Sequence, residues 1–171
     1  MKIRELTIQE ISQIYQDYIT IDFPLFERRP LETIIELYQQ QRYFAYGLFD
    51  QKIIGYAFFL GNTEELLCDY FAIIKEYRHQ KIGSYFLQKC LNTFSKATLY
   101  FEVEKPAAND KTKEKRIQFY LKNNLLLSSI EVNLFHVDYC ILANKEIHIS
   151  QIQSFYHSIY DDDFYDRYVI F

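Results

Sequence analysis

The feature that most constrains this chain is an apolar run, Leu66 to Ile74, which leads directly into a polar turn and then an amphipathic helix. The run is nearly continuous in apolar residues, as is typical of a strand buried on both faces near the centre of a sheet. The turn reads KEYRHQK, and the helix is predicted from about Gly83 to Phe94. A unit of this kind requires a core in which helices pack on a sheet.

The residues before this unit predict two helices and a hairpin. Thr7 to Glu10 reads T-x-x-E, which is a capping box that opens a first helix. Pro30 suits the first turn of a second helix, because its missing N–H would have no partner there. The strands predicted in this part are residues 3–6, 42–49 and 53–60, the last two joined by a turn at 50–52.

The residues after the unit predict further strands and helices. The predicted elements are a strand at 98–104, a helix at 113–122 and two strands at 125–130 and 134–142. Ser150 to Gln153 reads as a second capping box that opens a last helix with an apolar stripe. Asp161 to Asp163 is expected to be a solvated loop.

This order of elements predicts an α+β (mixed α/β) fold: a central, mostly antiparallel mixed sheet with helices on both faces. We expect a domain at residues 1–143 and a helical extension at residues 144–171. The extension is too apolar for a free tail and should pack on the domain or at a subunit interface.

The composition excludes several functional classes. Hydrophobic residues make up 49% of the 171, so a disordered chain is not expected. The 19 basic and 23 acidic residues give a net charge of −4, which argues against binding nucleic acid or an anionic membrane. The four His and three Cys residues show no metal-binding spacing, so no metal is expected. Without an apolar leader or a long apolar run, the chain reads as cytoplasmic.

The strand, turn and helix around residues 67–87 could bind an anion. The N-terminus of a helix carries unpaired N–H groups and the positive end of the helix dipole, which suits a pyrophosphate. Arg78, His79 and Lys81 add cationic or donor groups, and Gly83 permits a close approach of the backbone. An ordinary solvated turn explains the same residues, and composition alone favours that simpler reading.

The segment YRHQKIGSYFL resembles the acetyl-coenzyme A motif of the GNAT superfamily, in which Arg or Gln precedes x-x-Gly-x-Gly/Ala. Arg78 and Gly83 fit the first and last positions of this motif, whereas Lys81 stands where the first glycine is usual. The strand Asp69–Ile73 is similar to the coenzyme-binding strand of the family. The resemblance implies that the coenzyme contacts Phe71, Ala72, Ile73, Arg78, His79, Gln80, Lys81, Ile82, Gly83 and Ser84.

A second stretch carries the resemblance further, so that it covers roughly residues 1–143 in the order of elements. LYFEV, residues 99–103, is similar to the family's next strand, and RIQFYLKNNLL is similar to a later helix that typically ends in Tyr-x-x-x-Gly-Phe. Tyr120 matches the tyrosine, and Asn124 replaces the glycine. That replacement is mild, because Asn also adopts the left-handed conformation at the end of a helix.

The resemblance implies transfer of an acetyl group from acetyl-coenzyme A to a primary amine. A tyrosine protonates the departing thiolate, and a carboxylate removes a proton from the amine. Tyr120 is the expected acid, although with 16 Tyr in the chain it could be a core residue. Glu102 ranks first as the base, Asp69 second and Glu104 third, and Glu104 is also a candidate for binding the substrate. All three carboxylates could instead simply pair with Lys or Arg.

The expected partners are acetyl-coenzyme A and an amine acceptor, either a small molecule or a protein. We expect a monomer or a homodimer. The alternative function is a non-catalytic module with the same fold that binds an acyl-coenzyme A or a protein. Lys81 in place of glycine favours that alternative, whereas the matching Tyr120 and Glu102 favour the enzyme.

Overall fold

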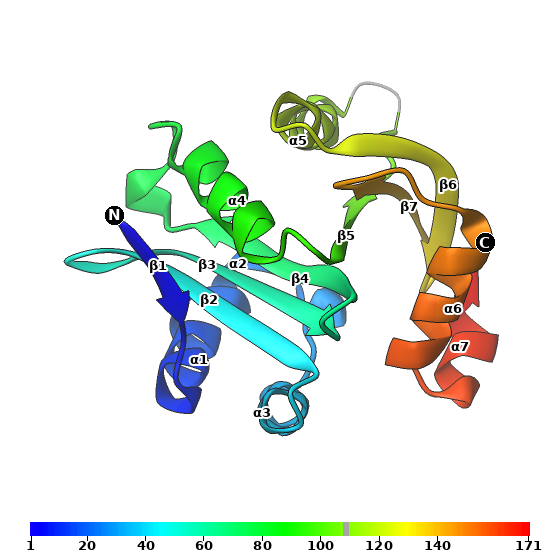
Figure 1. Ribbon diagram of the computed structural model, residues 1–171, viewed down its shortest axis with the longest axis horizontal. Coiled ribbons are helices and arrows are strands. Elements are labelled where there is room, and N and C mark those ends of the chain that lie inside the picture. The colour runs from blue at the N-terminus through cyan, green and yellow to red at the C-terminus, as the bar shows by residue number, and fades with distance from the viewer. Residues whose placement is uncertain (108–109) are drawn as a thin grey trace. The chain divides into compact units, whose positions relative to one another are not determined.

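The computed structural model describes residues 1–107 and 110–171, which form helices and strands along most of their length (Figure 1). The strands are β1 (Lys2–Glu5), β2 (Tyr43–Asp50), β3 (Lys52–Gly61), β4 (Glu65–Ile73), β5 (Thr98–Glu104), β6 (Leu126–Leu134), β7 (Val137–Ala143) and β8 (Val169–Ile170). The α-helices are α1 (Ile8–Ile14), α2 (Thr20–Asp22), α3 (Leu31–Gln39), α4 (Ile82–Thr93), α5 (Lys111–Lys122), α6 (Ile149–Ile159) and α7 (Asp162–Tyr168).

The strands of the described residues form one sheet, in which hydrogen-bonded neighbours follow the order β1-β2-β3-β4-β5-β7-β6-β8. The pair β4–β5 is parallel, whereas β1–β2, β2–β3, β5–β7, β6–β7 and β6–β8 are antiparallel. A mostly antiparallel mixed sheet with helices confirms the expected α+β class.

The chain divides into two compact units. Unit 1 comprises residues 1–62 and 69–90, and unit 2 comprises residues 63–68 and 91–171. Strand β4 supplies residues to both, because the border falls between Cys68 and Asp69. The C-terminal segment belongs to unit 2, and the expected domain border after residue 143 stays a prediction.

In unit 1, α4 lies over one face of the strands β1 to β3, and α1 and α3 lie on the other (Figure 1). The predicted capping box at the start of α1 is confirmed, because Thr7 and Glu10 exchange side-chain and backbone hydrogen bonds. Arg4 also binds the Glu10 carboxylate at 2.6 Å and, with Thr7, lowers the pKa of that carboxyl to about 2. Pro30 precedes α3 as its N-cap rather than standing in its first turn.

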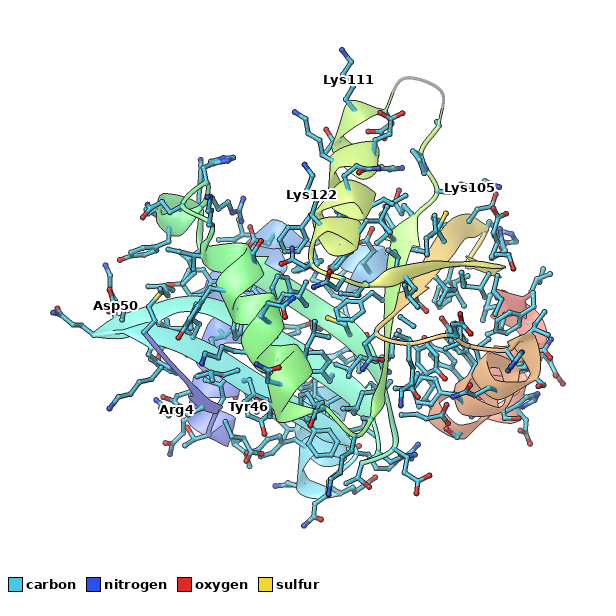
Figure 2. The ribbon with its side chains drawn as sticks, turned by 45° about the horizontal axis from the view of Figure 1, so that its top comes forward. Arg4, Tyr46, Asp50, Lys105, Lys111 and Lys122 are labelled. Atoms are coloured by element: carbon cyan, nitrogen blue, oxygen red, sulfur yellow. The ribbon has the colours of Figure 1, made fainter. Side chains whose placement is uncertain are left out.

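The predicted hairpin of unit 1 is also confirmed. Strands β2 and β3 pair down to Asp50 and Lys52, and Gln51 between them takes a left-handed conformation with φ 65°. Figure 2 shows Asp50 at the tip of this hairpin. Within the hairpin, Gly55 allows close packing, because a Cβ there would lie 3.0 Å from the carbonyl oxygen of Ala72.

Unit 2 has its own core, between α6 and the strands β5, β6 and β7. From α6 this core contains Ile152, Phe155 and Tyr156, each at most 1% exposed. Its other buried members are Leu67, Tyr100, Ile130, Val132, Leu134, Ile141, Ala143 and Val169. Burial of this many apolar side chains holds the C-terminal segment on the same chain.

Two boundaries of the predicted strands in unit 2 are wrong. Strand β6 continues to Leu134, and β7 begins only at Val137. The turn between them consists of Phe135 and His136, with φ values of 50° and 67°. Such a turn usually contains Asn or Gly, so its residues gave no turn signal.

The start of the last part of the chain also differs from the sequence-based expectation. Helix α6 begins after His148 without a side-chain cap, so Ser150 to Gln153 is not its capping box. Asp161 to Asp163 is not a loop. The Asp161 side chain accepts a hydrogen bond from the backbone N–H of Phe164 at 2.8 Å and thereby caps α7. Strand β8 then pairs with Asn133 and Leu134 of β6.

Candidate active site

The turn between β4 and α4, in unit 1, takes an unusual backbone path. His79 and Lys81 both adopt the left-handed conformation, with φ values of 67° and 60°. This conformation costs an ordinary L-residue roughly 1–2 kcal/mol and is nearly free for glycine. Lys81 therefore occupies a position that glycine would favour, which is the position at which the GNAT motif usually has its first glycine.

Arg78 holds this turn in place. Its Nε donates to the carbonyl oxygen of Ile73 at 2.7 Å, and its Nη2 lies 3.1 Å from Oδ1 of Asp22. The guanidinium thus joins the end of β4 to the end of α2, while its side chain remains 42% exposed. A partly exposed guanidinium in such a place can still meet an anion from solvent.

Helix α4 begins directly after the turn, at Ile82, and spans 12 residues. Tyr85 donates its backbone N–H to the carbonyl oxygen of Lys81, so the amides of Ile82, Gly83 and Ser84 belong to the first turn of the helix. Such amides point along the helix axis and favour an anion. With the exposed His79, Gln80 and Lys81 they form a donor set that fits the pyrophosphate of a coenzyme A.

The strand residues expected to contact the coenzyme have structural contacts in unit 1. The ring of Phe71 stacks on that of Phe86 in α4, with 5.3 Å between centroids. The carbonyl oxygen of Ala72 lies close to Gly55, and that of Ile73 accepts the Arg78 hydrogen bond. These contacts fix the end of β4 against α4 and the turn.

Asp69 is held by two neighbours in unit 1. Its Oδ2 accepts a hydrogen bond from Nε of Arg29 at 3.0 Å and another from the hydroxyl of Tyr43 at 2.6 Å. The Asp69 side chain is only 17% exposed. The contact is therefore the ion pair with Arg or Lys that the sequence left open as an alternative to a catalytic base.

Glu102 lies in β5, in unit 2, and contacts the C-terminal helix. Its Oε1 accepts a hydrogen bond from the hydroxyl of Tyr156 in α6. Tyr156 is completely buried, and burial raises the pKa of its hydroxyl well above the usual value, with the Glu102 carboxylate adding to the effect. The phenol therefore keeps its proton and acts as a donor to Glu102.

Glu104, two residues further along β5, has a different partner. Its Oε2 forms a salt bridge with Nζ of Lys113 in α5, and the same Nζ lies 3.7 Å from Oδ2 of Asp110. The three side chains are 22–31% exposed. Glu104 thus anchors the first turn of α5 to the end of β5, and Figure 2 shows Lys111 and Lys122 at the two ends of this helix.

Tyr120 lies on the buried face of α5. Its ring packs against Phe101 of β5, with 5.0 Å between centroids, and burial raises the pKa of its hydroxyl. The helix ends in the predicted left-handed cap: Asn124 has φ 67°, and the amides of Asn124 and Leu125 bond back to Leu121 and Tyr120. This Schellman motif sets where Tyr120 stands in the last turn.

The candidate acid and base lie on opposite faces of β5. Successive side chains of a strand point to opposite faces. Phe101 meets Tyr120 of α5 on one face, so Glu102 points to the other face, where it meets Tyr156 of α6. The pairing of β5 with β4 in unit 2 covers Thr98 to Tyr100, so Glu102 lies beyond those pairs.

The candidate residues therefore fall into two groups. Asp69 and residues 71–73 and 78–84 belong to unit 1, whereas Glu102, Glu104 and Tyr120 belong to unit 2. The sequence did not single out Arg29, Lys113 or Tyr156 as partners of the candidate carboxylates. One signal for Tyr156 was present, because a tyrosine on the apolar stripe of a helix needs a partner for its hydroxyl when it is buried.

Comparison with known protein families places the chain. The family model described as "Acetyltransferase (GNAT) family" matches residues 8–122, which is more than half of the chain. The chain belongs to the GNAT acetyltransferase family. Members of this family use acetyl-coenzyme A, and the matched residues include Asp69, the turn after β4, Glu102 and Tyr120.

Solved structures share this GNAT fold. A protein from Bacteroides thetaiotaomicron, described as an acetyltransferase of the GNAT family, has a TM-score of 0.79 at 17% identity, with 96% of this chain and 98% of that chain covered. The ribosomal-protein-S18-alanine N-acetyltransferase of Escherichia coli has a TM-score of 0.63 at 18% identity, covering 86% and 96%. The spermidine/spermine N-acetyltransferase SpeG of Vibrio cholerae has a TM-score of 0.61 at 13% identity, covering 83% and 92%.

No curated protein sequence gives a significant match to the chain. Among residues 1–107 and 110–171, no group of three or more His, Cys, Asp or Glu side chains could hold a metal ion. The helices of the same residues include none long and apolar enough to cross a membrane.

Proposed function

We propose that this GNAT protein transfers an acetyl group from acetyl-coenzyme A to a primary amine by direct attack of the amine on the thioester. The observation that carries the proposal is the turn at residues 78–84, where left-handed backbone, exposed donors and a helix N-terminus follow one another. Lys81 supports the enzyme rather than a degenerate module, because its φ of 60° preserves the path that a glycine would take.

The turn and the first residues of α4 bind the pyrophosphate. Amides of Ile82, Gly83 and Ser84 donate to its oxygens, and Lys81 and His79 add donors at the exposed side of the turn. Acetyl-coenzyme A supplies an activated acetyl group as a thioester. Backbone N–H groups of the central strand, at Phe71 to Ile73, polarise the thioester carbonyl as an oxyanion hole does.

Glu102 acts as the general base. A lysine-like amine has a pKa of about 10.4, so only about one molecule in 10³ is neutral near pH 7. A carboxylate that takes the proton, directly or through water, makes the remaining molecules reactive. Asp69 and Glu104 rank behind Glu102, because Arg29 and Lys113 already pair with them.

Tyr120 acts as the general acid. Its burial keeps the hydroxyl protonated at neutral pH, so a proton is available for the departing sulfur. An acceptor ammonium that used Glu104 would have to displace Lys113 from it.

The acceptor is an amine of a small molecule or of a protein. The names of two structural neighbours give one example of each kind. One neighbour acetylates spermidine and spermine, and the other acetylates the alanine of a ribosomal protein. The test is release of free thiol from acetyl-coenzyme A with a panel of polyamines, amino acids, aminoglycosides and peptides. Coenzyme binding by calorimetry without thiol release from any of these amines would favour the non-catalytic module instead.

A further inference from the structure

The contact between Glu102 and Tyr156 joins the candidate base to a part of the chain outside the matched family region. The family model ends at residue 122, whereas Tyr156 lies in α6, 54 residues after Glu102. Nothing in the GNAT motifs assigns a role to this tyrosine. Its hydroxyl nevertheless donates a hydrogen bond to Oε1 of Glu102.

Tyr156 is held firmly enough to orient a neighbouring group. Its ring is completely buried and packs edge-on against Phe155, Tyr160 and Phe171, with 5.3–6.2 Å between centroids. Adjacent to it, Phe155 packs on Tyr100 of β5, with 4.9 Å between centroids. The phenol is therefore fixed by the core of unit 2 and has little freedom to turn away from Glu102.

A core residue needs no hydroxyl at this place. A phenylalanine would fill the same space, whereas a buried phenol costs free energy unless its O–H finds an acceptor. Here the acceptor is a carboxylate that is itself half-buried, on the strand that carries the candidate base. The two polar groups satisfy each other, and a donor that binds a carboxylate favours its ionised form.

We propose that Tyr156 is a positioning residue, which holds the Glu102 carboxylate ionised and oriented for removal of the proton from the acceptor amine. This inference rests on the proposed function. It makes the C-terminal segment a part of the catalytic apparatus, although the segment lies beyond the residues by which the family is recognised. The phenol keeps its proton throughout, and only Glu102 gains and returns one.

Several other titratable groups lie around Glu102. By strand alternation and register, the titratable neighbours on the same side of β5 and β7 are Tyr100, Glu104 and Tyr139. Lys113 of α5 contacts Glu104, and Tyr160 packs against the ring of Tyr156. Tyr100 donates its hydroxyl to Glu65 at 2.6 Å, and Lys113 pairs with Glu104. On α6, the hydroxyl of Tyr156 donates to Glu102.

The test is Tyr156→Phe, with Tyr100→Phe as the matched control. Both changes remove one hydroxyl from a fully buried ring in the core of unit 2, and both hydroxyls donate to a carboxylate. Without its donor, Glu102 is protonated more readily. We expect the acidic limb of the kcat/KM profile of Tyr156→Phe to move up by roughly 0.5–1 pH unit and kcat to fall about threefold to tenfold. Tyr100→Phe should leave the limb in place.

A double-mutant cycle separates positioning from general loosening of the core. In the Glu102→Gln background, Tyr156→Phe should change kcat by less than about twofold, because there is no base left to position. If the wild-type protein is active and Tyr156→Phe has the same pH profile, the inference is overturned but the proposed function stands. A wild-type protein that releases no thiol with any amine overturns both.

An NMR titration of the Glu102 carboxyl carbon tests the contact without any need for turnover. The Glu102 signal is assigned as the carboxyl signal that is absent from the spectrum of Glu102→Gln. In Tyr156→Phe the carboxyl should titrate at higher pH than in the parent. Identical titration curves, in variants that melt as folded proteins, would show that the phenol does not set the protonation of Glu102 and would overturn the inference.

Discussion

Arg29 and Asp69 form an ion pair in unit 1, with Nε and Oδ2 3.0 Å apart and both side chains less than one fifth exposed. The backbone N–H of Arg29 also donates to the hydroxyl of Tyr70, at 2.7 Å. The pair therefore fixes the segment before α3 to strand β4. A carboxylate that is paired with a guanidinium is a weaker general base, because the cation favours its ionised form and so opposes uptake of a proton.

Asp69→Asn should lower the free energy of unfolding by about 1–3 kcal/mol, because the Arg29 guanidinium loses its charged partner in a half-buried place. Tyr43→Phe removes only the neutral donor to the same carboxylate and should cost less. Urea denaturation of the two variants measures the difference. If Asp69→Asn is as stable as the parent but loses activity near neutral pH and regains it at high pH, Asp69 is the base.

Glu102→Gln should reduce the rate most near neutral pH and least at high pH. A base matters only while the amine carries a proton, and raising the pH removes that proton without help. Rates of thiol release between about pH 6.5 and 10 give the profile. A loss of equal size across this range would assign Glu102 to binding, and Asp69 would then become the leading candidate.

Tyr120→Phe should lower kcat on the order of 10²-fold while leaving coenzyme binding nearly unchanged, because only the proton donor is removed. Phe119, its neighbour in α5, lacks a hydroxyl, so Phe119→Leu serves as a packing control. Steady-state kinetics and calorimetry with coenzyme A separate the two effects. Turnover at the parental rate would make Tyr120 a core residue.

Gly83→Val should weaken coenzyme A binding at least tenfold, or about 1.4 kcal/mol. The branched side chain of the valine would stand at the first turn of α4 and block the close approach of the coenzyme to the backbone. Gly83→Ala adds a single methyl group and should weaken binding less. Calorimetric titration with coenzyme A compares them. Parental affinity in the valine variant would remove the pyrophosphate from this turn.

Lys81→Gly should be more stable than Lys81→Ala by about 1 kcal/mol. Both changes remove the same charge, but only alanine keeps a Cβ in the left-handed conformation at φ 60°. Urea denaturation of the two variants isolates this backbone contribution. Equal stabilities would mean that the turn does not hold this conformation in solution.

Local patterns predicted much of the fold. The strand Thr98–Glu104 has the expected bounds, and Thr7 and Asn124 cap their helices as the sequence indicates. Patterns failed where a residue behaves against its type. Phe135 and His136 form a tight turn although neither is glycine, and Asp161 opens a helix although the acidic run suggested solvated coil.

The partners in the candidate site could not be predicted for a different reason. Glu102 and Tyr156 are 54 residues apart, and Asp69 and Arg29 are 40 apart. No periodicity or motif relates positions at such separations. Packing therefore decides which partner each carboxylate has. The contacts of Asp69 with Arg29 and of Glu102 with Tyr156 give the physical reason to rank Glu102 before Asp69.

Residues 63–68 belong to unit 2, although the chain on both sides of them belongs to unit 1. Their strand, Glu65–Leu67, lies beside Thr98–Tyr100 of β5. A gene fragment that encodes residues 91–171 alone would therefore produce β5 with an open hydrogen-bonding edge, and such edges invite aggregation. A fragment of unit 2 should therefore also contain residues 63–68, joined through a designed linker so that they can pair in parallel with β5.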